Sequence, residues 1–169
     1  MSAPLPSRAA PVDDPRMDWD LPHPHVVRFA VDDAEIDEYR HVNNAVYLTW
    51  CERVAWDHST ALGLGKAHCL SLDRGMANVR ATIAWLRPAL PGDVVEMGTW
   101  MLTPAPRVRA LRRFQVRRAS DATTLARIEI EYVCLELSTG RAVRAPREFT
   151  AAYAARADVL AALAGAPVV

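Results

Sequence analysis

A single stretch with helical periodicity is followed by several long stretches with strand periodicity, and few folds accommodate that imbalance. Between residues 44 and 62, apolar side chains recur at spacings of three, four and seven, the pattern of a helix with one buried face. Residues 107–118 and 124–137 instead alternate between apolar and charged side chains. Neighbouring segments of that kind form antiparallel strands that bury one face. Further strand candidates are residues 26–31, 76–86 and 94–102.

These elements predict an α+β fold in which a curved antiparallel sheet wraps around the one long helix. The sheet then buries the apolar face of that helix, which the helix cannot do alone. The outward rows of the two alternating segments are basic and acidic respectively, so they could pair across the strands. We interpret the arginines of the basic row, at positions 107, 109, 113 and 117, as a mostly solvated face.

Length and composition indicate one globular domain with a flexible N-terminal tail. The chain has 169 residues, 51% of them hydrophobic, and can bury roughly 70% of its unfolded surface, so its core needs no metal or disulfide. Residues 1–22 are rich in Pro, Ala and Asp and predict the tail, which leaves residues 23–169 as the domain. The domain is expected to end with a turn at residues 138–140, a strand reaching about residue 150, and an Ala-rich helix near residues 154–164.

Charge and cysteine content narrow the functional classes. The chain has 20 basic and 20 acidic residues, and this lack of net charge argues against a general nucleic-acid binder. The three cysteines, Cys51, Cys69 and Cys134, have no C-x-x-C spacing and predict reduced thiols. No stretch has the pattern of a signal peptide or of a membrane span. We therefore expect a cytoplasmic protein with no membrane span and no nucleic-acid partner.

The densest group of polar side chains lies directly before the predicted helix, in the run D-E-Y-R-H-V-N-N at residues 37–44. A carboxylate ahead of a helix N-terminus can attack a carbonyl, or activate water against it, while free N–H groups of the helix hold the carbonyl oxygen. That arrangement suits acyl transfer. Asp37 could equally have only a structural role in the turn, because Asp is common in loops, where its side chain forms local hydrogen bonds.

The neighbouring polar residues each have more than one interpretation. His41 fits either an anchor of the loop backbone or a group that orients the acid or a water molecule. Asn43 fits a helix N-cap. Asn44 needs only its backbone N–H to hold the carbonyl oxygen, so its side chain can have a structural role. Glu52, about two turns into the helix, competes for the acid role, with a salt bridge or a polar lid as the alternative. Tyr47 fits the core or a pocket wall.

The sequence around this run resembles a known family. D-E-Y-R-H-V-N-N-A-V-Y-L at residues 37–48, followed by C-E-R-V-A-W-D at residues 51–57, is similar to the signature of hot-dog-fold acyl-CoA thioesterases. The similarity is greatest to the bacterial long-chain acyl-CoA branch of this 4-hydroxybenzoyl-CoA thioesterase-like superfamily. R-P-A with G-D-V at residues 87–94 resembles the second strand and turn of that fold, and Y-V-C-L-E-L with T-G-R at residues 132–141 resembles its late strands. The resemblance spans about residues 25–150. It implies the hot-dog fold, hydrolysis of an acyl-CoA to a free acid and CoA, and a homodimer or homotetramer.

The resemblance also implies roles for individual residues. Asp37 lies on the family's catalytic aspartate, and the backbone N–H of Asn44 lies where the thioester carbonyl is polarised. The implied mechanism needs no metal and no cofactor beyond the CoA of the substrate, because a thiolate departs without a strong acid. In the 4-hydroxybenzoyl-CoA thioesterase branch a Gly commonly stands where this chain has Arg40. With His41 as a further catalytic candidate, the residues expected around the substrate are Asn43, Tyr47, Glu52 and, for the CoA phosphates, Arg107 and Arg109.

Two other functions fit the same fold. A hot-dog hydratase or dehydratase acts on enoyl or hydroxyacyl thioesters, and its pattern has an Asp and a His separated by four residues around an N-P pair. Here three residues separate Asp37 from His41, and no N-P follows. A non-catalytic acyl-CoA-binding module needs the pocket without the base, and Asp37 argues against it.

Overall fold

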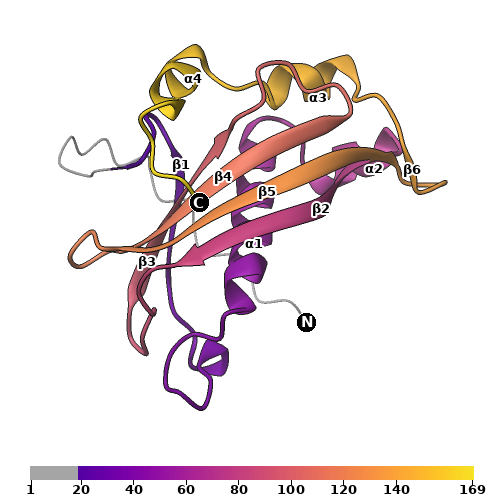
Figure 1. Cartoon of the computed structure of the whole chain (residues 1–169). Helices are drawn as coiled ribbons and strands as arrows, with labels where there is room; N and C mark the ends of the chain where they lie inside the picture. Colours follow the sequence, from indigo (N-terminus) through magenta and orange to yellow (C-terminus); the bar gives the residue numbers. More distant parts are fainter. Residues whose placement is uncertain (1–18) are drawn as a thin grey trace.

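The computed structural model describes residues 19–169, which form one antiparallel sheet with a long helix against one face (Figure 1). Within this part of the chain, β1, β3, β4, β5 and β2 follow one another across the sheet, and the short strand β6 pairs with β5. The sheet curls around helix α1, so the predicted α+β hot-dog architecture is confirmed. The main strands are β1 (His25–Ala30), β2 (Arg74–Trp85), β3 (Val94–Met101), β4 (Arg109–Arg118) and β5 (Thr124–Glu136).

Helix α1 (Val46–Ala61) packs the predicted apolar stripe into the main core. Tyr47, Trp50, Cys51 and Val54 are at most 1% exposed and contact the inward side chains of the sheet. The short helices η1 (Asp33–Glu35) and α2 (Lys66–Ser71) precede and follow it. None of the helices within residues 19–169 has the length and apolar character that a membrane crossing requires.

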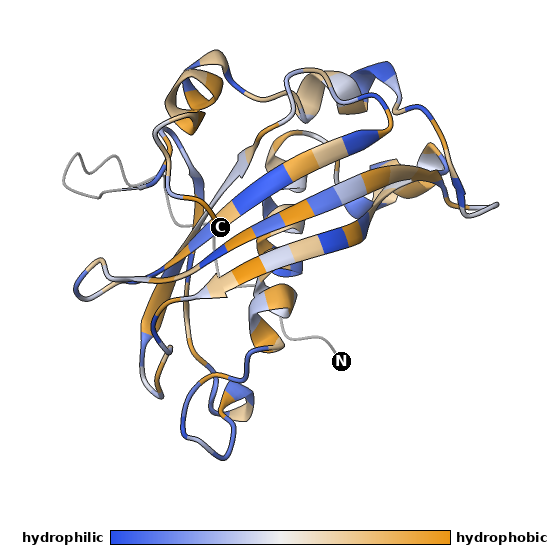
Figure 2. Cartoon of the chain, in the orientation of Figure 1, coloured by the Kyte–Doolittle hydropathy of each residue, from blue (hydrophilic) through white to orange (hydrophobic). Residues whose placement is uncertain are grey.

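Strands β4 and β5 alternate as predicted, which is visible as alternating blue and orange bands along the ribbon in Figure 2. Their inward side chains are fully buried, including Phe114, Ile128 and Ile130. Arg113 lies opposite Glu129 in the register and forms an ion pair with it. The predicted pairing between the basic and acidic outer rows is therefore confirmed at this position, because cross-strand neighbours on one face lie close enough to interact.

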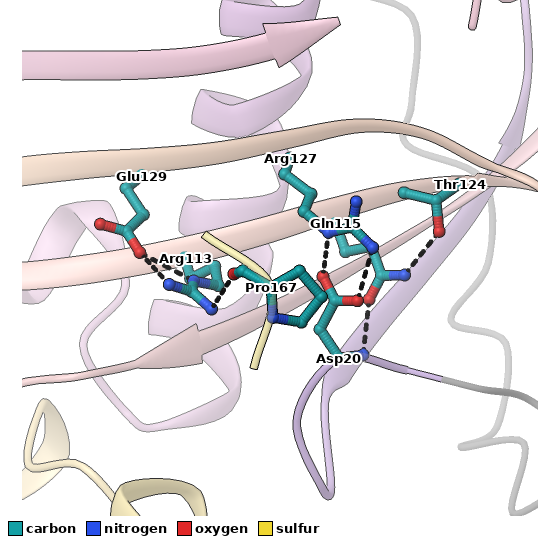
Figure 3. Close-up of polar contacts among 7 residues, drawn as sticks. All are labelled: Asp20, Arg113, Gln115, Thr124, Arg127, Glu129 and Pro167. Atoms are coloured by element: carbon teal, nitrogen blue, oxygen red, sulfur yellow. Dashed lines mark hydrogen bonds and ion pairs between the residues drawn. The ribbon is translucent and has the colours of Figure 1, made fainter. Parts of the chain in front are cut away.

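The prediction that the arginine row is mostly solvated is wrong for two of its four members. Arg113 is 6% exposed and Arg117 is fully buried. The cause is that both ends of the described chain cross the outer face of the sheet, opposite to α1 (Figures 1 and 3). The carbonyl of Pro167 accepts a hydrogen bond from Arg113 at 3.2 Å, and the Trp19 ring covers the Arg117 guanidinium at 4.5 Å.

The N-terminal segment is held by a partly buried ion pair. The Asp20 carboxylate accepts two hydrogen bonds from Arg127, at 2.6 and 2.8 Å, and the Asp20 backbone N–H donates to Gln115 at 2.9 Å (Figure 3). Leu21 is 1% exposed. The predicted tail boundary at residue 22 therefore differs from the structure, in which the segment 19–22 is packed. The rest of the predicted tail, residues 1–18, lies outside the described residues.

The predicted last strand ending near residue 150 is wrong. Strand β6 spans only Arg141–Ala142, and the chain then forms helices α3 (Arg147–Ala152) and α4 (Ala157–Leu163). Pro146 lacks a backbone N–H and directly precedes α3, a position that suits a helix start better than a sheet. Phe149 and Tyr153 are four residues apart and both pack into a second core cluster, which a helical turn permits.

Candidate active site

The polar run before α1 folds into a tight turn that begins at Asp37. The backbone N–H of Asp37 donates to the carbonyl of His41, and the N–H of Arg40 donates to the carbonyl of Asp37, both at 2.9 Å. Ile36 and Val42 pair across the base of the turn. Arg40 has a φ of 64°, the left-handed region that favours glycine. This is the position where the resemblance places a Gly in a related branch.

The Asp37 side chain is half-buried, and one of its oxygens is already engaged. Oδ1 accepts a hydrogen bond from the backbone N–H of Tyr39 at 2.9 Å, which fixes the orientation of the carboxylate. No hydrogen bond or ion pair among the described residues involves Oδ2. The two interpretations of Asp37 are thus compatible, because one oxygen stabilises the turn while the other stays open to a water or a carbonyl carbon.

The start of α1 follows this turn and leaves a backbone donor open. The side-chain oxygen of Asn43 accepts a hydrogen bond from the Ala45 N–H, and its carbonyl accepts one from the Val46 N–H, both at 2.9 Å. Asn43 therefore closes the turn that precedes α1, but the prediction that it is the N-cap is wrong, because the N-cap position is Ala45 and has no side-chain cap hydrogen bond. The Asn44 N–H makes no hydrogen bond within residues 19–169, and Asn44 is exposed. Free N–H groups at a helix start carry partial positive charge and bind anions.

Buried contacts fix the turn and the helix start against the core. The Val42 N–H donates to the carbonyl of Ala89, and the Asn43 N–H donates to the carbonyl of Glu35, both at 2.9 Å. The Glu35 carboxylate in turn accepts a hydrogen bond from the indole N–H of Trp50 at 2.8 Å. These hydrogen bonds join the loop that contains Asp37 to α1 and to the connection that follows β2, and they fix the position of the Asp37 turn.

His41 and Tyr47 have different surroundings. The half-buried His41 ring stacks against the exposed Tyr39 ring, with centroids 6.4 Å apart. Within the described residues, no hydrogen bond joins the His41 ring to Asp37. Tyr47 is 1% exposed, its hydroxyl accepts a hydrogen bond from the Ala89 N–H at 3.2 Å, and burial raises its pKa. Tyr47 therefore belongs to the main core.

Arg107 and Arg109 lie far from Asp37 within one protomer. Arg109 begins β4, on the outer face, and pairs with Glu131 at 2.7 Å, whereas Arg107 is exposed just before the strand. The other end of β4, at Arg118, lies beside the β2–β3 connection to which the Asp37 turn is bound. The ends of this 10-residue strand are about 30 Å apart, so the two arginines and Asp37 occupy opposite ends of the sheet.

A cavity of about 80 Å³ opens beside the middle of α1. Of the predicted site residues, only Glu52 lines it, and the Asp37 turn does not reach it. A single protomer therefore presents the catalytic candidates and the cavity as two separate features. The cavity walls come from α1, α2, four strands and the turn after α3, and the residues are Glu52, Ala55, Trp56, Ser59, Cys69, Met76, Asn78, Met101, Ala110, Arg112, Tyr132 and Tyr153.

Sequence reasoning missed Arg112, the one cavity residue with a buried charge. Its exposed fraction is 3%. The signal was present in the alternation of β4, because Arg112 is in phase with Ala110, Phe114 and Val116 on the inward row. A charged residue at an inward position of an otherwise apolar row is uncommon unless it is paired or functional.

Comparison with known proteins gives the family. The profile of the thioesterase-like superfamily matches residues 31–153, a span that includes the Asp37 turn, α1 and strands β2 to β6. The chain belongs to the thioesterase-like superfamily. The resemblance to hot-dog-fold thioesterases and the expectation of a thioester hydrolase are thereby confirmed, whereas the long-chain branch stays a prediction. The search among curated proteins found no significant match.

Solved structures share the fold at low sequence identity. A 1,4-dihydroxy-2-naphthoyl-CoA thioesterase from Synechocystis has a TM-score of 0.68 at 21% identity, over 76% of this chain and 93% of its own. A protein from Thermus thermophilus described as hypothetical has a TM-score of 0.69 at 26% identity, over 76% and 95%. A Staphylococcus aureus protein solved in complex with CoA has a TM-score of 0.71 at 15% identity, over 90% and 91%.

Proposed function

We propose that this member of the thioesterase-like superfamily hydrolyses an acyl-CoA to a free carboxylic acid and CoA. Asp37 is the general base or the nucleophile, and the backbone N–H of Asn44 is the oxyanion donor. One observation carries the proposal: a turn-fixed carboxylate with one unengaged oxygen precedes a helix start whose N–H has no partner within the described residues. A carbonyl bound to that N–H would be polarised toward attack.

The chemistry needs no more groups than these. As a base, Asp37 takes a proton from water while the water oxygen bonds to the thioester carbon. The tetrahedral oxyanion then collapses, the C–S bond breaks, and the thiolate leaves readily because thiol pKa values lie near about 8.5. As a nucleophile, an Asp37 oxygen bonds to the thioester carbon, the C–S bond breaks with release of the CoA thiolate, and water then hydrolyses the mixed anhydride to the free acid and the Asp37 carboxylate. An oxyanion donor contributes about 3 kcal/mol to such a step, and no metal or redox cofactor takes part.

We propose that the working unit is a homodimer formed through strand β2. This strand is the edge of the sheet after β5, spans 12 residues and exposes Val79 by 48% and Trp85 by 46%. A long edge strand with exposed apolar side chains is a surface that proteins normally cover. A two-fold axis near Val79 would extend the sheet across both protomers and bury these side chains.

The same pairing would combine the two separate features of the protomer. Antiparallel pairing of β2 with its copy sets the Arg74 end of one strand beside the Trp85 end of the other. The Asp37 turn is bound to the connection after Trp85, whereas Arg107, Arg109 and the cavity lie toward the Arg74 end. Each active site would then take Asp37 and Asn44 from one protomer and its cavity and phosphate-binding arginines from the other.

CoA as the carrier is supported by the family and by the CoA complex of the Staphylococcus aureus neighbour. The long-chain preference implied by the sequence resemblance, like assembly into a homotetramer, stays a prediction. A cytoplasmic location is supported by the three cysteines, Cys51, Cys69 and Cys134, which are free and buried. Free buried thiols are typical of proteins from reducing compartments.

The test is a thiol-release screen with the purified full-length protein over acyl-CoAs from acetyl to palmitoyl and over benzoyl-type esters. We expect release of free CoA with at least one acyl class at a rate far above the uncatalysed rate. Crotonyl-CoA is included, and its hydration without thiol release would replace the hydrolase by a hydratase. Tight acyl-CoA binding without any turnover would instead indicate a binding module and overturn the proposal.

A further inference from the structure

The cavity beside α1 combines apolar walls with one buried positive charge. Trp56 from the helix and Met76 and Met101 from the sheet form apolar walls, while the Arg112 side chain comes from the inward row of β4. The cavity volume of about 80 Å³ is several times the roughly 10–15 Å³ that one water needs. A ligand group larger than water therefore fits beside the guanidinium.

Arg112 lacks an anionic partner within the described residues. Its hydrogen bonds run from Nη1 to the Ala55 carbonyl at 3.5 Å and to Nδ1 of His58 at 3.3 Å. The rings of Tyr132 and Tyr153 lie 5.9 and 5.8 Å from the guanidinium carbon. No carboxylate of residues 19–169 forms an ion pair with it. A buried Arg normally has such a partner, because removing an ion from water costs several kcal/mol.

The titratable groups around Arg112 do not supply the missing charge. Burial, together with Arg112, lowers the pKa of His58 to about 3, so its imidazole is neutral. Burial raises the pKa of the Cys51 thiol and of the Tyr132 and Tyr153 hydroxyls, so these groups are neutral too. Glu52 lines the cavity but is exposed and lies outside ion-pair distance of the guanidinium. The buried part of the cavity therefore holds the Arg112 charge without an ion pair, and Glu52 lies at its exposed side.

We propose that this cavity receives the far end of an acyl group that ends in a carboxylate, with Arg112 as its counter-charge. The substrate class is then the CoA monothioester of a dicarboxylic acid. A guanidinium presents parallel N–H donors that match a carboxylate, and Nη2 and Nε have no hydrogen bond within the described residues. This inference rests on the proposed hydrolase function, to which it adds the substrate class.

In the proposed dimer, the cavity that completes an active site belongs to the partner of the protomer that supplies Asp37, because the Asp37 turn does not reach the cavity of its own protomer. The acyl group therefore extends from the thioester carbonyl across the protomer interface, and its far end enters the cavity. A methyl-terminated acyl chain of equal length would cover the guanidinium without pairing it, and burying a charge without a partner disfavours binding.

The experiment compares matched acyl-CoA pairs that differ only in their terminal group: succinyl with butyryl, adipoyl with hexanoyl, and suberoyl with octanoyl. For at least one pair, wild-type kcat/KM should favour the dicarboxylic member by about tenfold or more. Arg112→Met should remove that preference mainly through KM, which should rise for the dicarboxylic member and fall for the methyl-terminated member. Arg156→Met is the matched control, because Arg156 is 62% exposed and does not line the cavity, so this variant should keep the preference.

A second measurement keeps the inference testable if Arg112→Met does not fold. Free adipate and suberate should raise the Tm of the wild-type protein more than the uncharged hexanol and octanol do at equal ionic strength. Equal turnover of both members of every pair, unchanged by Arg112→Met, would overturn the inference and leave the hydrolase intact. No turnover of any acyl-CoA would overturn the proposed hydrolase function. A Tm increase specific to the dicarboxylates would in that case still show that the cavity binds a terminal carboxylate.

Discussion

Nδ1 of His58 lies 3.3 Å from Nη1 of Arg112, so a buried imidazole faces a buried guanidinium. His25 stacks on the other side of the imidazole, with ring centroids 4.6 Å apart, and pairs with Asp57 at 2.6 Å. Burial first, then Arg112 and His25, lower the pKa of His58 to about 3. A neutral His58 is therefore built into the folded state.

The first prediction follows from that low pKa. The pKa of His58 is about 6.5 in the unfolded chain, so between these values the unfolded state binds more protons. The free energy of unfolding then decreases as the pH falls below about 6.5, by up to about 2 kcal/mol between pH 7 and pH 5. Urea unfolding at both pH values should show this loss in the wild type. The loss should be smaller by most of that amount in His58→Gln, and an unchanged loss would contradict the assignment. His68→Gln is the control, since His68 is exposed.

The second prediction concerns the segment that crosses the outer face of the sheet. Asp20 is 6% exposed at its side chain and makes two hydrogen bonds to Arg127. Asp20→Ala leaves the partly buried Arg127 charge without its partner and should lower the free energy of unfolding by about 2 kcal/mol. Asp20→Asn keeps one acceptor and should cost less. Urea denaturation checks this, with Asp158→Ala at an exposed pair as the control, and equal stability of Asp20→Ala and wild type would contradict it.

The third prediction tests the backbone of the Asp37 turn. Arg40 has a φ of 64°, where a β-branched residue is strained more than Arg and Gly is not strained. Arg40→Val should lower stability by about 1 kcal/mol or more and reduce thiol release, because the turn carries Asp37. Arg40→Gly should fold and retain activity. Tm and kcat of both variants measure this, and normal activity in Arg40→Val would show that the turn geometry does not matter.

The fourth prediction tests strand β2 as the dimer interface. Val79 lies near the middle of the exposed edge, so a lysine there would meet its own copy across a two-fold axis. Val79→Lys should shift the sedimentation profile from dimer to monomer and abolish most of the thiol release. Val168→Lys, at a position that is 90% exposed near the C-terminus, should do neither. A wild-type protein that sediments as a monomer would exclude this interface.

Local patterns were sufficient for most of the fold. The alternation in β4 and β5 predicted the buried face correctly, because side chains two residues apart in a strand point to the same face. Phe114 and Ile128, which are partners across the two strands, both lie on that face. The spacing of Tyr47, Cys51 and Val54 likewise located α1. Helical and strand periodicity depends only on which side chains of a segment are buried, and the order of apolar and polar residues within that segment records it.

Long-range contacts accounted for what the sequence did not predict. Arg117 is buried because Trp19, almost a hundred residues away in the sequence, covers it, and no local pattern contains that contact. The apolar residues around Pro146 do not by themselves distinguish a strand from a short helix, so the local sequence does not reveal the helical turn at Phe149. The cavity beside Arg112 is formed by residues from several elements, so the sequence of β4 alone does not reveal it.

The central claim is that the Asp37 carboxylate performs the chemistry. Asp37→Asn is the appropriate variant, because the Asn side-chain oxygen can still accept the hydrogen bond from the Tyr39 N–H and so preserve the turn. Glu38→Gln removes a neighbouring exposed carboxylate and serves as the matched control.

The most direct measurement is single-turnover release of CoA by wild type, Asp37→Asn and Glu38→Gln under saturating enzyme, with urea unfolding as a check on the fold. We predict a decrease of about 10²–10⁴-fold for Asp37→Asn with unchanged stability, and a rate near wild type for Glu38→Gln. A folded Asp37→Asn variant that releases CoA within a few-fold of the wild-type rate would contradict the account.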